Sequence, residues 1–351
     1  PGVWQEVTAS DYLAEVKALA KGFIASGIKP GQRVGIMSPT SYEWALCDFA
    51  LWFAGAVSVP IYESSAPAQI EWILSDSDAV ALFIENDEHQ ARVDQIRSKT
   101  PRVDHIWQID SSDFTKLHQA GEKVADEVLE TARTNATLGD LATIVYTSGT
   151  TGNPKGCELT HRSLVDHCKN AAAEIPEIAN DRQHSLIFLP MAHIFARYVS
   201  VLCIYSGIRV GHLGDTKLVA EVLPVFKPTF LLAVPRVFEK VYNGAELKAE
   251  AAGKGKIFRT AAETAIEYSK ALDSKGGPSL GLKIKHGLFD KLVYSKLRAA
   301  MGGNVKYAIS GGAPLGARLG HFYRGIGLVV LEGYGLTETA AAAVIGRVSW
   351  Q

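Results

Sequence analysis

A loop rich in glycine and hydroxyl side chains constrains this chain more than any other stretch. Residues 147–156 read Thr-Ser-Gly-Thr-Thr-Gly-Asn-Pro-Lys-Gly and follow an apolar run at 141–146. Backbone N–H groups, four hydroxyls and one lysine can therefore turn toward a single polyanion. Residues 160–166 then show a helical pattern, with Thr160 as the expected N-cap. The order strand, loop, helix predicts a phosphate-binding loop.

Two other interpretations of residues 147–156 are weaker. A solvated linker would need neither a buried strand before it nor a lysine at a fixed position after its glycines. A Walker A loop requires the spacing Gly-x-x-x-x-Gly-Lys-Ser/Thr. Counting from Gly149, however, puts Pro154 at the second glycine, and Gly156 follows Lys155. Because proline also removes an N–H donor, the spacing disfavours a P-loop kinase or GTPase and indicates a nucleotide-phosphate loop of another kind.

Three sequence blocks resemble the signatures of the AMP-forming acyl-adenylate synthetases, a superfamily that includes acyl-CoA synthetases, peptide-synthetase adenylation domains and firefly luciferase. They are residues 144–156, residues 310–315 (Ser-Gly-Gly-Ala-Pro-Leu) and residues 332–339 (Glu-Gly-Tyr-Gly-Leu-Thr-Glu-Thr). They stand in the family's order, and the resemblance covers essentially the whole chain. It implies an α/β fold with two stacked, doubly wound, mostly parallel sheets and a small β-barrel portion, as in the superfamily's large N-terminal domain.

The resemblance also suggests boundaries within residues 1–351. Residues 31 to about 175 would form one sub-domain, and residues 1–30 would join 176–351 in the other. Predicted strands alternate with predicted helices in both halves, which favours parallel sheets covered on both faces. Family members continue for roughly another domain that completes the reaction. We therefore expect the small C-terminal domain to be absent, and the 351 residues to bind ATP and acyl-adenylate but to catalyse poorly.

Composition excludes several classes of function. The net charge of −1 gives no basis for binding nucleic acid. The four cysteines are scattered without Cys-x-x-Cys spacing, which favours a reducing cytoplasm. The longest apolar stretches are shorter than the ~20 residues of a membrane-spanning helix. The sequence carries no signal for the oligomeric state.

The implied reaction joins a carboxylate to the α-phosphate of ATP, releases pyrophosphate and passes the acyl group to coenzyme A. Charge accumulates on phosphoryl oxygens, so positioning and electrostatic stabilisation carry most of the catalysis. The predicted cradle for the β- and γ-phosphates consists of Thr147, Ser148, Gly149, Thr150, Thr151, Gly152 and Lys155. The resemblance places adenine beside Ser310, Gly311, Gly312, Ala313, Gly333, Tyr334 and Gly335, with the ring of Tyr334 stacked on it.

Four residues are the predicted catalytic groups: Lys155, His193, Thr337 and Glu338. By resemblance Thr337 meets the α-phosphate, and Glu338 holds Mg²⁺, a hard cation that takes carboxylate oxygen. Glu338 could also be a carboxylate that stabilises a helix N-terminus, and the two roles are compatible. His193 lies in residues 189–197, which resemble the motif beside the acyl site, and is expected to line the carboxylate end of the pocket. A satisfied core histidine is the structural alternative.

Substrate class rests on three stretches. The sequence His-Ile-Phe-Ala-Arg at 193–197, residues 234–242 and the helical insertion after them resemble bacterial long-chain fatty acid–CoA ligases. The sequence therefore predicts a long-chain fatty acid–CoA ligase that uses ATP, Mg²⁺ and coenzyme A. A fatty acyl-AMP ligase or an amino-acid adenylation domain serving a carrier protein are the enzymatic alternatives. A non-catalytic nucleotide-binding protein is the alternative of another class.

Residues 240–300 are helical and basic, with twelve Lys and Arg against six Asp and Glu. They could form an ordinary solvated helical face. They could also form a membrane-surface patch, which would make a cytoplasmic protein peripheral at the membrane, or a contact for the phosphates of coenzyme A. The sequence leaves these interpretations open.

Overall fold

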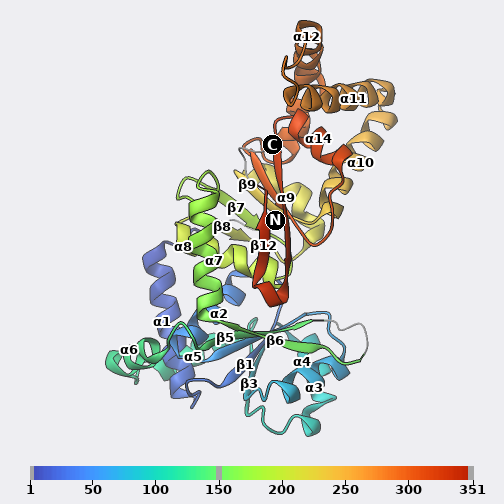
Figure 1. The fold of residues 1–351 in the computed structure, drawn as a ribbon. Helices are drawn as coiled ribbons and strands as arrows, with labels where there is room; N and C mark the ends of the chain where they lie inside the picture. Colours follow the sequence, from blue (N-terminus) through green and yellow to red (C-terminus); the bar gives the residue numbers. More distant parts are fainter. Residues whose placement is uncertain (1–3, 148–151, 347–351) are drawn as a thin grey trace. The chain divides into compact units, whose positions relative to one another are not determined.

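The computed structural model describes residues 4–147 and 152–346. Two compact units divide the chain, each around one six-stranded sheet (Figure 1). The first unit comprises residues 1–168, 188–200 and 337–341, and the second comprises 169–187, 201–336 and 342–351. The α/β prediction is confirmed in both.

The sheet of the first unit has the strand order β4-β3-β1-β2-β5-β6. Its strands are β1 (Arg33–Met37), β2 (Val57–Ile61), β3 (Ala81–Ile84), β4 (His105–Gln108), β5 (Leu141–Thr147) and β6 (Lys155–Thr160). The pairs from β4 to β5 are parallel, and β6 is antiparallel to β5. Every residue of β2 and β3 is buried, as expected for parallel strands covered on both faces.

Residues 9–135 of the first unit contain its N-terminal helices. They are α1 (Ala9–Ala25), α2 (Tyr42–Phe53), α3 (Pro67–Asp76), α4 (Asp87–Asp94), the 3₁₀ turn η1 (Arg97–Lys99), α5 (Asp113–Gly121) and α6 (Asp126–Asn135). The side chain of Thr8 accepts from the Asp11 N–H, and the side chain of Ser41 accepts from the Trp44 N–H. These are the caps that satisfy the free N–H groups of a helix start.

Helix α1 belongs to the first unit, whereas the resemblance placed residues 1–30 with the second. The physical reason is its close packing on α5. A Cβ on Gly22 would lie 2.5 Å from the carbonyl oxygen of Leu117, and a Cβ on Gly121 would lie 2.7 Å from the Gly22 nitrogen. Only glycine allows this approach of two backbones. The apolar face of α1 was predictable from the sequence, but its packing partner was not.

The phosphate-loop prediction needs a correction in its local structure. A strand, β6, lies between the loop and the next helix. It pairs with β5 in antiparallel orientation, with Thr147 opposite Lys155. The exposed, glycine-containing start of β6 lacks the apolar alternation that indicates a strand. Thr160 accepts from the Ser163 N–H at 3.3 Å, so the predicted N-cap is confirmed.

The sheet of the second unit has the order β12-β11-β10-β9-β7-β8. Its strands are β7 (His184–Ile187), β8 (Arg209–His212), β9 (Phe230–Ala233), β10 (Tyr307–Ser310), β11 (Val329–Leu336) and β12 (Ala341–Ile345). The pairs from β8 to β11 are parallel. All strands of the described residues belong to the two sheets, so the small barrel implied by the resemblance is not present among them.

Helical elements occupy most of the remaining sequence. They are α7 (His161–Glu174), α8 (Ile194–Ser206), η2 (Thr216–Leu218), α9 (Val219–Phe226), α10 (Pro235–Ala251), α11 (Gly255–Leu272), α12 (Leu280–Phe289), the π-helical turn η3 (Asp290–Tyr294), α13 (Ser295–Ala300), α14 (Ala317–Gly325) and η4 (Thr337–Thr339). The predicted helical insertion therefore corresponds to α10–α13. In the described part of the chain, no helix has the length and apolar character needed to cross a membrane.

Candidate functional site

A pocket of about 320 Å³ in the first unit brings three predicted site residues together. Its wall includes Thr147 at the end of β5, His193 before α8 and Thr337 in η4. The remaining lining residues are Pro60, Tyr62, Ser65, Gln69, Ile73, Val145, Tyr146 and Pro154. These are mainly apolar and aromatic side chains with a few polar groups, a composition typical of small-molecule sites. Thr147, His193 and Thr337 come from distant parts of the sequence and share this pocket.

Helix α3 holds both described ends of the predicted phosphate loop. The Trp72 indole N–H donates to the Pro154 carbonyl at 2.8 Å, and the Tyr146 hydroxyl donates to the Asp76 carboxylate at 2.6 Å. The predicted loop residues Ser148, Gly149, Thr150 and Thr151 lie outside the described residues. The described ends of the loop are thus fixed to the sheet by β5–β6 pairing and to α3 by two side chains.

Lys155 begins β6 and is exposed. Gly156 follows it because the site has no room for a larger residue. A Cβ on Gly156 would lie 2.8 Å from Ile144 Cγ2 and 3.2 Å from the Tyr146 ring. The lysine side chain is a mobile point charge, which suits a phosphate group that must leave.

His193 lies in a turn that is tied to the first unit by Thr40. The Thr40 hydroxyl donates to the Leu189 carbonyl at 2.7 Å and accepts from the Met191 N–H at 3.1 Å. The Phe195 N–H donates to His193 Nδ1 at 3.1 Å. This bond assigns the proton of the neutral ring to Nε2, and desolvation lowers the pKa of His193, which favours that neutral form. The imidazole can therefore donate one hydrogen bond from Nε2.

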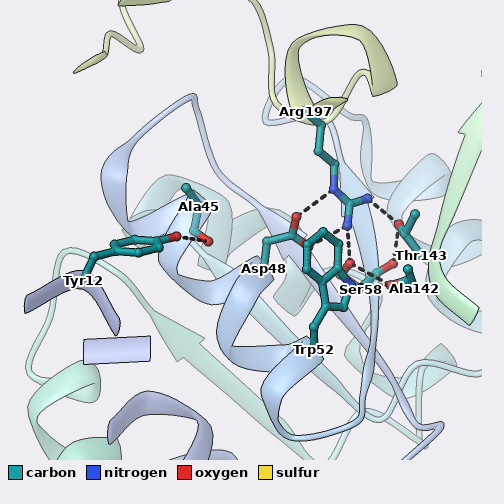
Figure 2. Close-up of polar contacts among 8 residues, drawn as sticks. All are labelled: Tyr12, Ala45, Asp48, Trp52, Ser58, Ala142, Thr143 and Arg197. Carbon is teal, nitrogen blue, oxygen red and sulfur yellow. Dashed lines mark hydrogen bonds and ion pairs between the residues drawn. The ribbon is translucent and has the colours of Figure 1, made fainter. Parts of the chain in front are cut away.

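A buried arginine connects α8 to β5, and the sequence analysis missed its role. Figure 2 shows the Arg197 guanidinium against the Asp48 carboxylate, with Nε–Oδ2 and Nη2–Oδ1 distances of 2.8 and 2.6 Å. Its other donors reach the hydroxyls of Ser58 and Thr143. Arg197 is 0% exposed and Asp48 is 1% exposed. Every charge in this cluster is therefore paired away from water.

Aromatic rings and backbone bonds complete the arginine cluster. The guanidinium carbon lies 5.3 Å from the centroid of the Trp52 ring. The Thr143 hydroxyl donates to the Ser58 carbonyl, and the Arg197 N–H donates to the His193 carbonyl at 3.3 Å. Thr143 and Thr147 share β5, so the cluster links the turn of His193 to the strand of Thr147. An arginine within the otherwise apolar 194–206 segment was the available sequence signal.

Thr337 and Glu338 form η4, and η4 contacts β6 in the first unit. Glu338 is exposed. Desolvation raises the pKa of Cys157 on β6, and the negative charge of Glu338 raises it further. Within residues 4–147 and 152–346, no group of three or more His, Cys, Asp and Glu residues is arranged so that it could hold a metal ion. One carboxylate still fits Mg²⁺, since this ion is usually held by one or two carboxylates together with substrate phosphates and water.

The predicted adenine residues lie in the second unit, at the ends of the neighbouring parallel strands β10 and β11. Ser310 is paired in register with Glu332, whose Oε1 accepts from the Leu315 N–H at 2.8 Å. Glu332 therefore fixes the loop that contains Gly311, Gly312 and Ala313. Gly312 has a φ of +82°, which requires glycine in practice.

Tyr334 is 68% exposed, so its ring has a face available for stacking. It lies between Gly333 and Gly335 on β11. The Ser310 hydroxyl is fully buried and has no hydrogen-bond partner among the residues that the structure describes. The second unit thus combines an exposed aromatic ring with glycines that have no side chain. This arrangement fits a flat heterocycle.

The predicted site residues consequently fall into two groups. Thr147, Gly152, Lys155, His193, Thr337 and Glu338 lie in the first unit, and Ser310, Gly311, Gly312, Ala313, Gly333, Tyr334 and Gly335 lie in the second.

Known proteins are similar to this chain in sequence and in fold. Over 99% of its length, the chain is 49% identical to the long-chain-fatty-acid–CoA ligase FadD15 of Mycobacterium tuberculosis, of which it covers 58%. It is 30% identical to long chain acyl-CoA synthetase 3 of Arabidopsis thaliana, covering 98% of this chain and 53% of that protein. The chain thus spans little more than half the length of these relatives.

Solved structures show the same fold at lower identity. The N-terminal domain of FACL13 from Mycobacterium tuberculosis superposes with a TM-score of 0.71 at 21% identity, covering 98% of this chain and 72% of that one. A long-chain-fatty-acid–CoA ligase from Archaeoglobus fulgidus gives 0.70 at 20% identity, covering 99% and 62%. A family model described as AMP-binding enzyme matches residues 2–351. The chain is therefore a member of the AMP-binding enzyme family.

Proposed function

We propose that the chain carries the adenylation site of a long-chain fatty acid–CoA ligase, an acid–thiol ligase. The whole reaction activates the fatty acid with ATP to acyl-AMP and pyrophosphate and then transfers the acyl group to coenzyme A. The observation that carries the proposal is that Thr147, His193 and Thr337 all line one pocket. The names of the relatives at 49% and 30% identity support this substrate class.

The residues of the first unit have complementary roles in this proposal. Thr147, Gly152 and Lys155, with Ser148, Gly149, Thr150 and Thr151, hold the β- and γ-phosphates. Thr337 binds the α-phosphate, and Glu338 holds Mg²⁺, which neutralises phosphate charge when it is bound. His193 donates from Nε2 to the substrate carboxylate. It has no role as a base, because a carboxylic acid is already ionised near neutral pH.

The second unit binds the adenine in the same proposal. Ser310, Gly311, Gly312 and Ala313 border the base through their backbone, and Tyr334 between Gly333 and Gly335 stacks on it. Residues 1–351 then serve as the large AMP-binding domain. We also propose a cytoplasmic protein that contacts membranes peripherally, since long-chain fatty acids partition into bilayers.

Thermal melting with non-hydrolysable acyl-adenylate analogues tests the proposal. Acetyl, octanoyl, palmitoyl and aminoacyl forms would each be added to the chain. A ligand at 100 times its Kd stabilises the folded state by about 2.7 kcal/mol and raises the Tm by several degrees. We expect the largest shift for palmitoyl, a reduced shift in Thr337→Val and an unchanged shift in Thr131→Val, which alters an exposed side chain of α6.

Two results would contradict the proposal. A largest shift with the aminoacyl analogue would identify an amino-acid adenylation domain. Equal Tm shifts in Thr337→Val and in the unmodified chain would show that Thr337 does not contact the adenylate.

A further inference from the structure

One face of α12 and of the π-helical turn η3 that follows it exposes a stripe of apolar side chains. Leu280, Ile284, Leu288 and Leu292 follow one another at intervals of four residues, and they are 74%, 67%, 56% and 49% exposed. Residues four apart on a helix lie on the same face. We name these four residues the α12 stripe. Such a run of large exposed apolar side chains is unusual for a surface without a partner.

The opposite face of α12 holds the helix to the second unit. His286 Nε2 lies 2.6 Å from the Gly325 carbonyl oxygen, and its ring stacks on Tyr268 at 3.9 Å between centroids. Phe289 is 9% exposed, and Figure 1 shows α12 beside α11. The helix therefore already has an inward face, and the α12 stripe is a second apolar face.

Positive charges flank the stripe. Lys283, Lys285 and Lys291 are exposed, and none forms an ion pair within the described parts of the chain. Helix α12 contains no acidic residue. Asp290, which follows the helix, is 2.7 Å from Arg298, so its charge is already paired. The surface thus combines exposed leucine and isoleucine with uncompensated lysine charge.

We infer that the α12 stripe and its lysines are a docking surface for an anionic lipid bilayer. Helices that lie in a membrane interface combine an apolar face with flanking lysines, because the apolar side chains enter the acyl boundary while the ammonium groups meet anionic headgroups. The positive charge of the lysines favours an anionic bilayer over an uncharged protein partner. The inference deepens the peripheral membrane contact proposed above, and it would bring the protein to the phase where its proposed fatty acid substrate concentrates.

Vesicle sedimentation tests the inference. The chain would be mixed with vesicles of phosphatidylcholine alone and with vesicles of equal parts phosphatidylcholine and phosphatidylglycerol. One variant combines Ile284→Ser with Leu288→Ser, and another combines Lys283→Glu with Lys285→Glu. The control is Val225→Ser, which removes a 62% exposed side chain of the same unit from α9.

We expect the unmodified chain and Val225→Ser to sediment with anionic vesicles and to be released by salt. Both double variants should bind about tenfold more weakly. Equal binding by all variants, or no sedimentation of the unmodified chain, would overturn the inference. Self-association that is lost with Ile284→Ser and Leu288→Ser, without vesicle binding, would also overturn it and would assign the stripe to a contact between two copies. Melting with acyl-adenylate analogues is independent of this measurement, so the two proposals can fail separately.

Discussion

The Thr40 hydroxyl joins the Leu189 carbonyl and the Met191 N–H, at 2.7 and 3.1 Å, and so fixes the turn that precedes His193. Thr40 and Met191 are buried. We expect Thr40→Val to lower the free energy of unfolding by about 1–3 kcal/mol, because the buried Met191 N–H and the partly buried Leu189 carbonyl lose their partner. Urea unfolding measures this. Thr131→Val, which removes an exposed hydroxyl bonded to the Glu127 carbonyl, should change stability by at most about 0.5 kcal/mol.

The buried pair of Arg197 and Asp48 should show strong coupling. Replacing either residue with alanine leaves the other charge buried without its partner, which costs about 3–5 kcal/mol. Unfolding in urea followed by tryptophan fluorescence is suitable, since the Trp52 ring lies beside the guanidinium. The double variant Arg197→Met, Asp48→Leu should cost much less than the sum of the single changes.

An exposed ion pair provides the control for this prediction. Arg236 and Glu239 are 3.1 Å apart, with side chains 73% and 42% exposed. Arg236→Ala should change stability by less than about 1 kcal/mol. Additive single and double variants at Arg197 and Asp48 would contradict the coupling.

Glu332 should act on nucleotide binding through the loop that it holds. Glu332→Ala removes the acceptor for the Leu315 N–H and should weaken binding of an acyl-adenylate analogue about tenfold, measured by calorimetry, which corresponds to about 1.4 kcal/mol. Glu332→Gln keeps an acceptor oxygen and should restore most of the affinity. Equal loss in both variants would show that charge, and not the hydrogen bond, is what matters.

Glu338 should control the Mg²⁺ dependence of ATP binding. Titration of ATP into the chain with and without Mg²⁺ measures the gain in affinity that the ion provides. Glu338→Ala should reduce this gain about tenfold, because the protein loses its predicted carboxylate ligand. Glu158→Ala, which removes an exposed carboxylate of β6, is the matched control. An unchanged gain in Glu338→Ala would refute the metal role.

His212 should make the stability of the second unit depend on pH. Desolvation lowers its pKa from 6.5 to about 4, and Nε2 is buried without a partner in the described structure. The unfolded chain therefore takes up a proton below pH 6.5 before the folded chain does. The contribution of His212 to the free energy of unfolding is fully present above pH 6.5 and is lost as the pH falls toward 4. The loss amounts to about 3 kcal/mol at most.

The comparison of the unmodified chain with His212→Gln isolates this contribution. The free energy of unfolding of the unmodified chain should fall more steeply between pH 6.5 and 4, because glutamine does not titrate in this range. Parallel curves for the two proteins would contradict the assignment.

Elements and motifs with local signals could be predicted from the sequence. The Thr8 cap and the apolar face of α1 follow from short-range rules, as do the buried strands that precede the glycine motifs. Strand β6 could not be predicted in this way, since its stability comes from pairing with β5. The packing of Gly22 against Leu117 and the Arg197 cluster depend on contacts between distant residues, which periodicity does not encode.

The site shows the same division. Residue types and family resemblance indicated Thr147, His193 and Thr337, and the pocket brings them together. Thr40 lies in none of the three sequence blocks, and Glu332 begins the 332–339 block without a predicted role. Each acts through a hydrogen bond to the backbone of another segment.

The order of synthesis on the ribosome gives the arginine cluster a further consequence. Asp48 precedes Arg197 by 149 residues, and at about 5–20 residues per second this interval takes about 7–30 s. During that time the carboxylate has no guanidinium partner. When residue 168 emerges, the nascent first unit therefore cannot yet bury Asp48 as a paired charge. That step must wait until synthesis has passed through strand β7 of the second unit and reached Arg197.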